Sequence, residues 1–465
     1  MKVMPNFDPI IEKITDYVQS FEAKENSLLE AKTCFFDSLA CSFLALKYDQ
    51  VQKFCSIEYI KNSTGSSRVI GTDIKSNPVE AAFLNGALIR WLDFNDTWLA
   101  KEWGHPSDNL AAILSMYDYL KVERNKNFSF KDLLNLMVIA HEVQGCLAIE
   151  NSLNEVGVDH VAFVKVASAA IASKMLGQGP QKMNSTISNS FIDGQSLRTY
   201  RHFPNTGTRK SWAAGDASAR GIKQAFISEV SEEIYPSALS AKTWGFNDVI
   251  MKKDSLKLQR ELDSYVMDNI LYKVNFPAEF HAQTAAEAAI NLKKSNKFKI
   301  EDIEQVEILT QEPGVRIISK KGPLKNYADR DHCIEYIVAW CLINGSLNSD
   351  SYSDASSKDP QIESLRNCTV TKEDKNYTKN YYDLNDRAIG NKVSIKLKNG
   401  IVFHEEVKYP LGHKQRREES KPFLKEKFKS AMEKFGIDTE YLMKVYESNN
   451  LDDVDISNIL DKIYK

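Results

Sequence analysis

Apolar residues recur at helical spacing through most of the first half of the chain. The segment FDPIIEKITDYVQSF (7–21) repeats them every three or four positions, which predicts an amphipathic helix. The segment LLEAKTCFFDSLACSFLAL (28–46) is apolar around most of its circumference and is therefore expected to be buried. Alanine, glycine and serine enrich residues 213–227, which suits a central helix whose backbone approaches its neighbours closely. Similar helical patterns predict further helices at 78–92, 130–149 and 160–176.

The pattern changes after about residue 290. QVEILTQE (305–312) and KVSIKLKNGIVFHEEV (392–407) alternate apolar and polar residues, which is typical of strands. Asn399-Gly400 within the second segment favours a tight hairpin turn. A helix-like run, CIEYIVAWCLING, lies between the two segments, and helical spacing returns from Pro422 onward.

These patterns predict a mainly α protein with an inserted α+β domain. We expect a large helical domain over 1–270, a smaller α+β domain over 271–408, and carboxyl-terminal helices over 409–465 that return to the first domain. The chain has 465 residues, of which 43% are hydrophobic, and this is enough apolar material for two or three domains.

The overall charge is close to balanced. Lysine and arginine number 60 against 63 acids, and the net charge of -3 predicts no general attraction to nucleic acid or to an anionic membrane. The amino-terminal segment has acids inside its first apolar run, unlike a signal peptide, and no uncharged run approaches the length that crosses a bilayer. We therefore expect a cytoplasmic protein.

The seven cysteines are scattered, with no C-x-x-C pair and no fourfold cluster. This spacing suggests neither an iron–sulfur centre nor a structural zinc site, and the odd number argues against a disulfide framework. We expect buried free thiols. The chain also has no G-x-G-x-x-G or P-loop pattern of the kind that binds nucleotides.

One short stretch, LDFNDTWLAKEWGHPSDN, is rich in groups that could do chemistry. It contains Asp93, Asp96, Thr97 and His105. A helical run follows His105, and Ser107 or Asp108 would serve as its N-cap. His105 would then lie just outside a helix N-terminus, where backbone N–H groups can meet an anion. Helix capping with packed tryptophans explains the same residues, so both interpretations stay open here.

A second stretch, DGQSLRTYRHFPNTGTRKSW, gathers positive charge. Within thirteen residues it holds Arg198, Arg201, His202, Arg209 and Lys210. No acid lies between Asp193 and Asp216, so these groups should repel one another unless they are solvated or paired with anions. Arginine forks match carboxylates and phosphates, and the repulsion would then be relieved by a bound anion.

Five segments in this order carry a resemblance to a known family. They are RWLDFNDTWLAKEWGHPSDNL, LNEVGVDHVAFVKVAS, GQSLRTYRHFPNTGTRKSWAAGDASARG, FPAEFHAQTAAEAA and YPLGHKQRR. Together they closely resemble the MmgE/PrpD family, and within it the branch that dehydrates 2-methylcitrate. The segments are long, contain unusual residues such as tryptophan and arginine, and span almost the whole chain, so the resemblance is specific.

The resemblance implies a large helical bundle domain with a smaller α+β lid domain that closes over a cleft. It also implies a homodimer and a reaction that uses no metal, flavin or nicotinamide cofactor. The implied reaction removes water from the tricarboxylate 2-methylcitrate, in the methylcitrate cycle of propionate catabolism, and gives 2-methyl-cis-aconitate. Citrate or cis-aconitate could serve as further substrates.

The chemistry requires a base, a proton for the departing hydroxide and cations for the carboxylates. By position in the family motifs, the resemblance implies active-site roles for Asp93, Thr97, His105, His160 and Lys210. His105 and His160 are the acid–base candidates, Asp93 orients a partner, and Lys210 is a carboxylate clamp or an alternative proton carrier. The candidates for substrate binding are Arg198, Arg201, Arg209, His281, His413 and Lys414.

Several alternatives stay open at this stage. Taken alone, His160 and His281 are more typical of core or capping positions, and the run at His413 is more typical of a solvated charge cluster. One or two of the arginines could support the fold instead of the substrate. Within the family, cis-aconitate decarboxylation and dicarboxylate epimerisation use the same kind of carbanion. A non-catalytic scaffold and a zinc hydrolase are weaker alternatives, the latter because no metal-ligand spacing is present.

Overall fold

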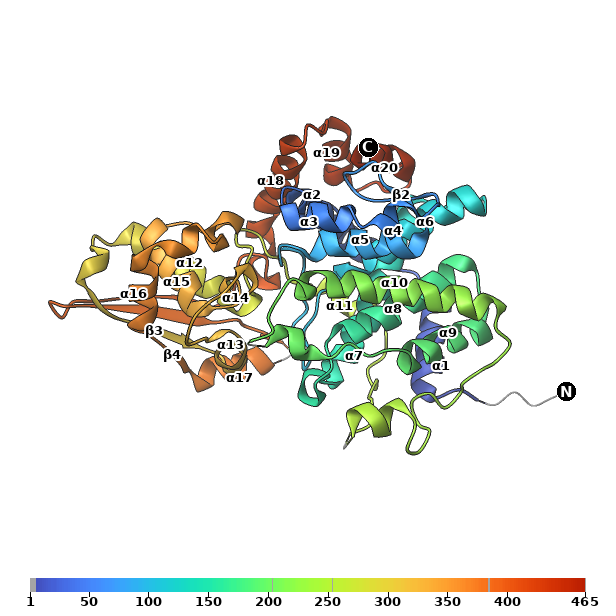
Figure 1. Cartoon of the computed structure of the whole chain (residues 1–465), viewed down its shortest axis with the longest axis horizontal. Coiled ribbons are helices and arrows are strands. Elements are labelled where there is room, and N and C mark those ends of the chain that lie inside the picture. The colour runs from blue at the N-terminus through green and yellow to red at the C-terminus, as the bar shows by residue number, and fades with distance from the viewer. Residues whose placement is uncertain (1–5, 203, 253, 384, 465) are drawn as a thin grey trace. The chain divides into compact units, whose positions relative to one another are not determined.

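The computed structural model describes residues 6–202, 204–252, 254–383 and 385–464, which form two compact units. Unit 1 ends its first segment at Asn205, continues from Arg209 to Ile270 and resumes at Leu424. Unit 2 consists of Thr206–Thr208 and Leu271–Phe423. The protein is mostly helical, with one small mixed sheet (Figure 1).

The chain returns to unit 1 later than residue 409, the boundary expected from the sequence. The division falls within helix α18 (Arg417–Lys434). The preceding segment stays with unit 2 because the Tyr272 N–H donates to the Gly412 carbonyl at 3.2 Å. The Arg416 guanidinium, next to α18, also pairs with Glu287 of unit 2 at 3.0 Å.

Unit 1 is built almost entirely from helices. Its α-helices before α18 are α1 (Pro9–Ser20), α2 (Glu25–Ala45), α3 (Asp49–Cys55), α4 (Glu58–Lys61), α5 (Pro78–Arg90), α6 (Leu110–Glu123), α7 (Phe130–Glu150), α8 (Val161–Leu176), α9 (Pro180–Ile192), α10 (Arg209–Val230) and α11 (Tyr265–Asp268). The carboxyl-terminal part adds α19 (Glu440–Glu447) and α20 (Ile456–Ile463). Strands β1 (Ser67–Arg68) and β2 (Lys75–Ser76) form a two-residue antiparallel pair, and the short helices are η1 (Pro106–Asn109), η2 (Asn154–Val156), η3 (Arg198–Arg201) and η4 (Asn247–Met251).

Helix α10 lies against both α5 and α8 (Figure 1). A Cβ atom added at Gly215 would lie 2.3 Å from the Phe83 carbonyl oxygen of α5. One added at Gly221 would lie 2.8 Å from the Lys165 carbonyl oxygen of α8. Only glycine allows such close approach at these positions. The predicted central helix with close neighbours is confirmed.

Helix α7 is the one described helix that is long and apolar enough to cross a membrane by length and composition. Of its most apolar 18-residue window, 89% is buried inside the protein, as is also usual for a helix in the core of a protein. A capping box between Ser129 and Asp132 begins the helix. This helix carries His141 into the interior of unit 1.

Unit 2 contains a four-stranded sheet in the order β4-β3-β5-β6. The strands are β3 (Ile303–Thr310), β4 (Thr369–Glu373), β5 (Asn391–Leu397) and β6 (Val402–Val407). β3 pairs with β4 in parallel and with β5 antiparallel, and β5 and β6 form an antiparallel hairpin. Gly400 in the turn has φ 86°, so the hairpin predicted from Asn399-Gly400 is confirmed.

Helices α12 and α15 pack together beside this sheet (Figure 1). Their alanines and aliphatic side chains meet Val306 and Ile308 of β3 and Val393 and Ile395 of β5 in one apolar core. The α-helices of unit 2 are α12 (Gln283–Ser295), α13 (Glu312–Ile318), α14 (Tyr327–Arg330), α15 (Ile334–Asn344), α16 (Pro360–Asn367) and α17 (Lys375–Tyr382). Short helices are η5 (Phe280–Ala282), η6 (Ile300–Asp302), η7 (Ser349–Tyr352), η8 (Ser356–Lys358) and η9 (Lys414–Arg416).

All seven cysteines lie within the described residues and are free thiols. Six are buried, and Cys368 is half-buried. The expected buried thiols are thus confirmed except for partial exposure at one position.

Candidate active site

The segment between α5 and α6 carries the first group of candidate residues. Asp93 follows the end of α5 and adopts a left-handed backbone conformation with φ 51°. Few residues other than glycine adopt this region, and aspartate and asparagine tolerate it best. The Asp93 carboxylate accepts a hydrogen bond from Arg90 at 2.5 Å, and both side chains are buried. Strained backbone of this kind is typical of functional sites.

His105 is held in one orientation by the backbone of the same segment. Its Nδ1 lies 2.6 Å from the Asp96 carbonyl oxygen and 3.5 Å from the Thr97 hydroxyl. A carbonyl can only accept, so Nδ1 carries the hydrogen. In the neutral ring Nε2 is then the proton acceptor, and it lies 3.8 Å from the Asp93 carboxylate. The ring is buried.

The helix after His105 begins differently from the expectation. A short turn, η1, precedes α6, and neither Ser107 nor Asp108 caps a helix with its side chain. The Ser107 N–H and hydroxyl instead donate to the Asp96 carboxylate, at 3.1 and 2.6 Å. The predicted cap is wrong because a carboxylate from the preceding loop satisfies this N–H group. His105 does lie immediately before the helical turn, as expected.

His160 lies close to His105, with ring centroids 5.8 Å apart at 63°. The Arg201 guanidinium donates to His160 Nε2 at 3.0 Å, which leaves the hydrogen of the neutral ring on Nδ1. This Nδ1 is buried and has no hydrogen-bond partner among the described residues. Burial, reinforced by the charge of Arg201, lowers the pKa of His160 to about 3, so the ring is neutral at physiological pH.

Asp159 compensates the positive charges of Arg198 and Arg201 in the basic stretch. It is fully buried, and its carboxylate accepts hydrogen bonds from both Arg201 and Arg198, the latter at 3.3 Å. Burial alone would raise the pKa of Asp159, but Arg201, His160 and Arg198 outweigh it and hold that pKa well below the usual range. For Arg198 and Arg201, the prediction that a bound ligand relieves the repulsion is therefore wrong, because the protein supplies its own carboxylate.

The rest of this stretch leads into α10. Arg209 lies over the Trp212 ring at 4.3 Å and pairs with Asp216 at 3.6 Å. Lys210 is buried in the first turn of the helix. Phe203, which belongs to the same motif, lies outside the described residues.

Two further buried acids, Glu102 and Asp108, lie in this part of unit 1, and nothing in the sequence indicated that their pKa values are shifted. Burial raises the pKa of Glu102 to about 7 against the opposing charge of Arg198. Burial likewise raises the pKa of Asp108 to about 8, against the charge of Arg90. Carboxyl groups that titrate near neutral pH are typical of functional sites. Asp159, which was also missed, directly precedes His160 in a motif that had been singled out.

The remaining candidates lie in unit 2. His281 is fully buried between Glu279, 2.7 Å from Nδ1, and the Tyr381 hydroxyl, 3.1 Å from Nε2. Burial alone would raise the pKa of Glu279, but the charge of His281 and its hydrogen bond lower it. Neither partner of His281 was identified from the sequence, because Tyr381 lies 100 residues away in the chain.

His413 and Lys414 begin the short helix η9. His413 Nε2 donates to the Arg387 carbonyl at 3.2 Å, and Nδ1 accepts from the Gln415 N–H at 3.1 Å. Burial lowers the pKa of His413 to about 4, so this ring is a neutral capping group. Lys414 is exposed.

Comparison with known proteins places these residues in context. The MmgE/PrpD N-terminal domain matches residues 12–259, and the MmgE/PrpD C-terminal domain matches residues 276–463. The 2-methylcitrate dehydratase of Salmonella typhimurium is 48% identical over 92% of this chain and 91% of its own length. The mitochondrial 2-methylcitrate dehydratase of Yarrowia lipolytica is 49% identical over 91% of this chain and 84% of its own. A probable 2-methylcitrate dehydratase of Saccharomyces cerevisiae is 45% identical over 98% of this chain and 92% of its own.

Proposed function

The chain belongs to the MmgE/PrpD family, and from this we propose that it is a 2-methylcitrate dehydratase, a hydro-lyase that converts 2-methylcitrate to 2-methyl-cis-aconitate. The observation that carries the proposal is identity of 45 to 49% with dehydratases over at least 91% of this chain. The lid domain, the homodimer and the place in propionate catabolism belong to the same proposal. Because one relative is named as mitochondrial, the cytoplasmic location stays a prediction.

The reaction breaks two bonds on neighbouring carbons. A proton leaves the carbon next to a carboxylate, and hydroxide leaves the adjacent carbon. Negative charge develops on a carboxylate that is already anionic, so donors must meet that charge while a base takes the proton. The departing hydroxide must also receive a proton. His105 and His160, two buried histidines of unit 1, divide the tasks of base and of donor to the developing charge.

His105 is the base. Its Nδ1 hydrogen is committed to the Asp96 carbonyl, so Nε2 is the atom that accepts the substrate proton. The imidazolium that forms lies 3.8 Å from the Asp93 carboxylate, which stabilises the positive charge. Arg90 in turn holds Asp93 in place. The left-handed backbone at Asp93 is the strain that this arrangement requires.

His160 donates a hydrogen bond in its neutral form. A ring whose pKa is about 3 carries no proton to release to hydroxide at neutral pH, but its buried Nδ1–H can bind the charge that develops on the substrate carboxylate. A side chain at Gly104 would crowd this nitrogen, because an added Cβ atom would lie 3.3 Å from it. Asp159, through Arg201, holds the ring in the required tautomer.

Arg209 and Lys210 are the cations of unit 1 that we assign to substrate carboxylates, and Lys210 is also the candidate that protonates the departing hydroxide. Lys210→Arg separates the two roles of Lys210, because arginine keeps the charge but gives up no proton near neutral pH. A clamp would keep much of its activity in Lys210→Arg and lose it in Lys210→Ala. A proton carrier would lose activity in both variants. His281, His413 and Lys414 remain candidates for substrate binding in unit 2.

The direct test is a substrate panel of methylcitrate isomers, citrate and cis-aconitate, followed by the absorbance of the conjugated double bond. We expect dehydration of at least one methylcitrate isomer, loss of turnover in His105→Asn and His160→Asn, and near-normal turnover in the control His404→Asn. His404 is an exposed histidine on β6. Carbon dioxide release from cis-aconitate, without hydration or dehydration of any compound, would overturn the proposal in favour of a decarboxylase.

A further inference from the structure

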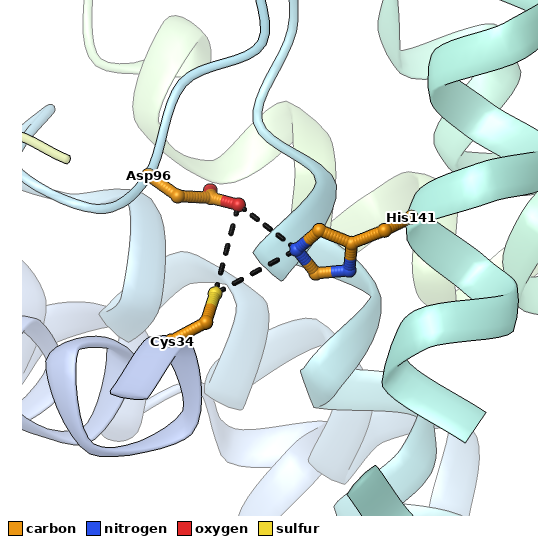
Figure 2. Close-up of side chains that lie close together, drawn as sticks. All are labelled: Cys34, Asp96 and His141. Carbon is orange, nitrogen blue, oxygen red and sulfur yellow. Dashed lines mark hydrogen bonds and ion pairs between the residues drawn. The ribbon is translucent and has the colours of Figure 1, made fainter. Parts of the chain in front are cut away.

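A buried cluster behind the candidate site joins three segments of unit 1. Cys34 comes from α2, His141 from α7 and Asp96 from the loop after α5, and Figure 2 shows the three side chains pointing toward one another. His141 Nε2 lies 3.0 Å from the Asp96 carboxylate, and the Cys34 sulfur lies 3.6 Å from the same nitrogen. All three side chains are almost fully buried.

Asp96 connects this cluster to His105 in two ways. Its carboxylate accepts from His141 and from the N–H and hydroxyl of Ser107, and so ties the loop to α7 and to η1. Its carbonyl oxygen accepts from His105 Nδ1 at 2.6 Å. Asp96 is therefore anchored through its side chain, and its carbonyl oxygen is the acceptor that fixes the tautomer of His105.

We propose that His141 and Asp96 are positioning residues, which hold the Asp96 carbonyl against His105 and so direct His105 Nε2 toward the substrate. This proposal rests on the proposed function for the role of His105 as base. Two hydrogen bonds, both made by Asp96, connect His141 to His105, so His141 touches no reacting atom. A displacement of this loop by about 1 Å is enough to lower the rate by a factor of roughly 100.

The ring of His141 is held by a contact at each of its two nitrogens. His141 Nδ1 lies 2.8 Å from the Met137 carbonyl, and Nε2 faces a carboxylate. His141 therefore bridges the backbone of α7 and the Asp96 carboxylate through its two ring nitrogens. A buried polar ring held on both sides stays in place, because any movement would leave a buried partner without its hydrogen bond.

The thiol is a neighbour of this pair and has no positioning role in the proposal. Burial, together with the carboxylates of Asp96 and Asp37, raises the pKa of the Cys34 thiol well above its usual range. It therefore stays protonated and donates weakly to Asp96, at 3.7 Å. The same three side chains have the composition of a metal site, so metal binding is the rival that the experiment must separate.

The experiment measures turnover and the tautomer of His105 in His141→Gln, Asp96→Asn and Ser107→Ala, with Cys34→Ala as the matched control from the same cluster. Histidine labelled with ¹⁵N reports which ring nitrogen carries the hydrogen, and His105→Asn assigns the signal. We expect kcat to fall by about 10- to 100-fold in His141→Gln and Asp96→Asn, with KM changed less than about threefold. In both variants, the ¹⁵N signal of His105 should no longer show the hydrogen on Nδ1 alone. Ser107→Ala, the mildest change, covers the case in which Asp96→Asn does not fold.

Three outcomes would overturn the proposal. The first is an unchanged His105 signal and near-normal kcat in folded His141→Gln. The second is an equal loss in Cys34→Ala, which would indicate a general packing effect. The third is stoichiometric metal in the purified protein that disappears in Cys34→Ala. Failure of the proposed function looks different: the wild-type protein would not dehydrate methylcitrate, while the tautomer of His105 would still depend on His141 and Asp96.

Discussion

Replacing Asp159 with asparagine tests the buried charge network most directly. The carboxylate is fully buried and bonds two arginines, one of which also bonds His160. Asparagine keeps the shape of the side chain but removes its charge, which leaves Arg201 and Arg198 buried without the carboxylate that bonds them both. Breaking a buried ion pair from one side costs roughly 3–5 kcal/mol, a large part of a typical unfolding free energy of about 5–15 kcal/mol.

This cost converts into a measurable shift of the melting temperature. Unit 1 has about 300 residues, so with an unfolding entropy of roughly 2.1 cal/mol/K per residue each kcal/mol lowers the melting temperature by about 1.5 °C, and Asp159→Asn should melt on the order of 5–8 °C below the wild-type protein. Differential scanning calorimetry measures the shift, and circular dichroism at low temperature confirms that the variant is folded. Turnover at low temperature should fall as well, because Arg201 no longer holds the tautomer of His160.

Asp216 offers a matched control in the same unit. It also lies between two arginines, Arg209 at 3.6 Å and Arg220 at 3.1 Å, but its side chain is 28% exposed, against 0% for Asp159. Exposed pairs of this kind contribute about 0–1 kcal/mol, so Asp216→Asn should change the melting temperature by only a few degrees at most. Equal shifts in the two variants, or a shift below about 2 °C in Asp159→Asn, would refute the reasoning from burial.

Three further predictions follow from the site. The pKa of His160 is about 3 in the folded protein and about 6.5 in an unfolded chain, so the stability that its neutral ring contributes is present above about pH 6.5 and is lost as the pH falls toward 3. In His160→Asn the melting temperature should therefore fall less steeply between about pH 6.5 and 3 than in the wild-type protein. An unchanged pH dependence of melting would contradict this prediction. Asp93→Asn should lower kcat far more than the yield of folded protein, and wild-type turnover would remove Asp93 from the mechanism. Activity should survive exhaustive chelation, and a loss that only one divalent metal restores would show that a metal takes part.

The secondary structure of much of the chain could be predicted because its causes are local. The periodicity of residues 130–149 corresponds to α7, and the alternation on both sides of Asn399-Gly400 corresponds to the β5–β6 hairpin. The small residues of 213–227 form the central helix α10, where neighbouring backbones leave no room for side chains. Each of these properties depends on residues within a few positions of one another.

The ion pairs could not be predicted in the same way, because their partners are distant in sequence. Asp159 is 42 residues from Arg201, and Asp96 is 45 residues from His141. Counting charges within the stretch that contains Arg198 and Arg201 gave an excess of positive charge, although folding brings in a buried aspartate from outside it. The cap predicted at Ser107 or Asp108 was wrong for a related reason, since the Asp96 carboxylate reaches the Ser107 N–H from the preceding loop.

The pairing of Asp159 changes which cations serve the substrate. Arg201 already bonds Asp159 through two nitrogens and also donates to His160, so its donors are used to fix a tautomer. Arg198 bonds the same carboxylate and is largely buried, and burial lowers its pKa. A cation that is neutralised by a buried anion attracts a second anion only weakly. The affinity for a tricarboxylate should therefore depend more on Arg209 and Lys210, whereas Arg198 and Arg201 should affect kcat through His160 more than they affect KM.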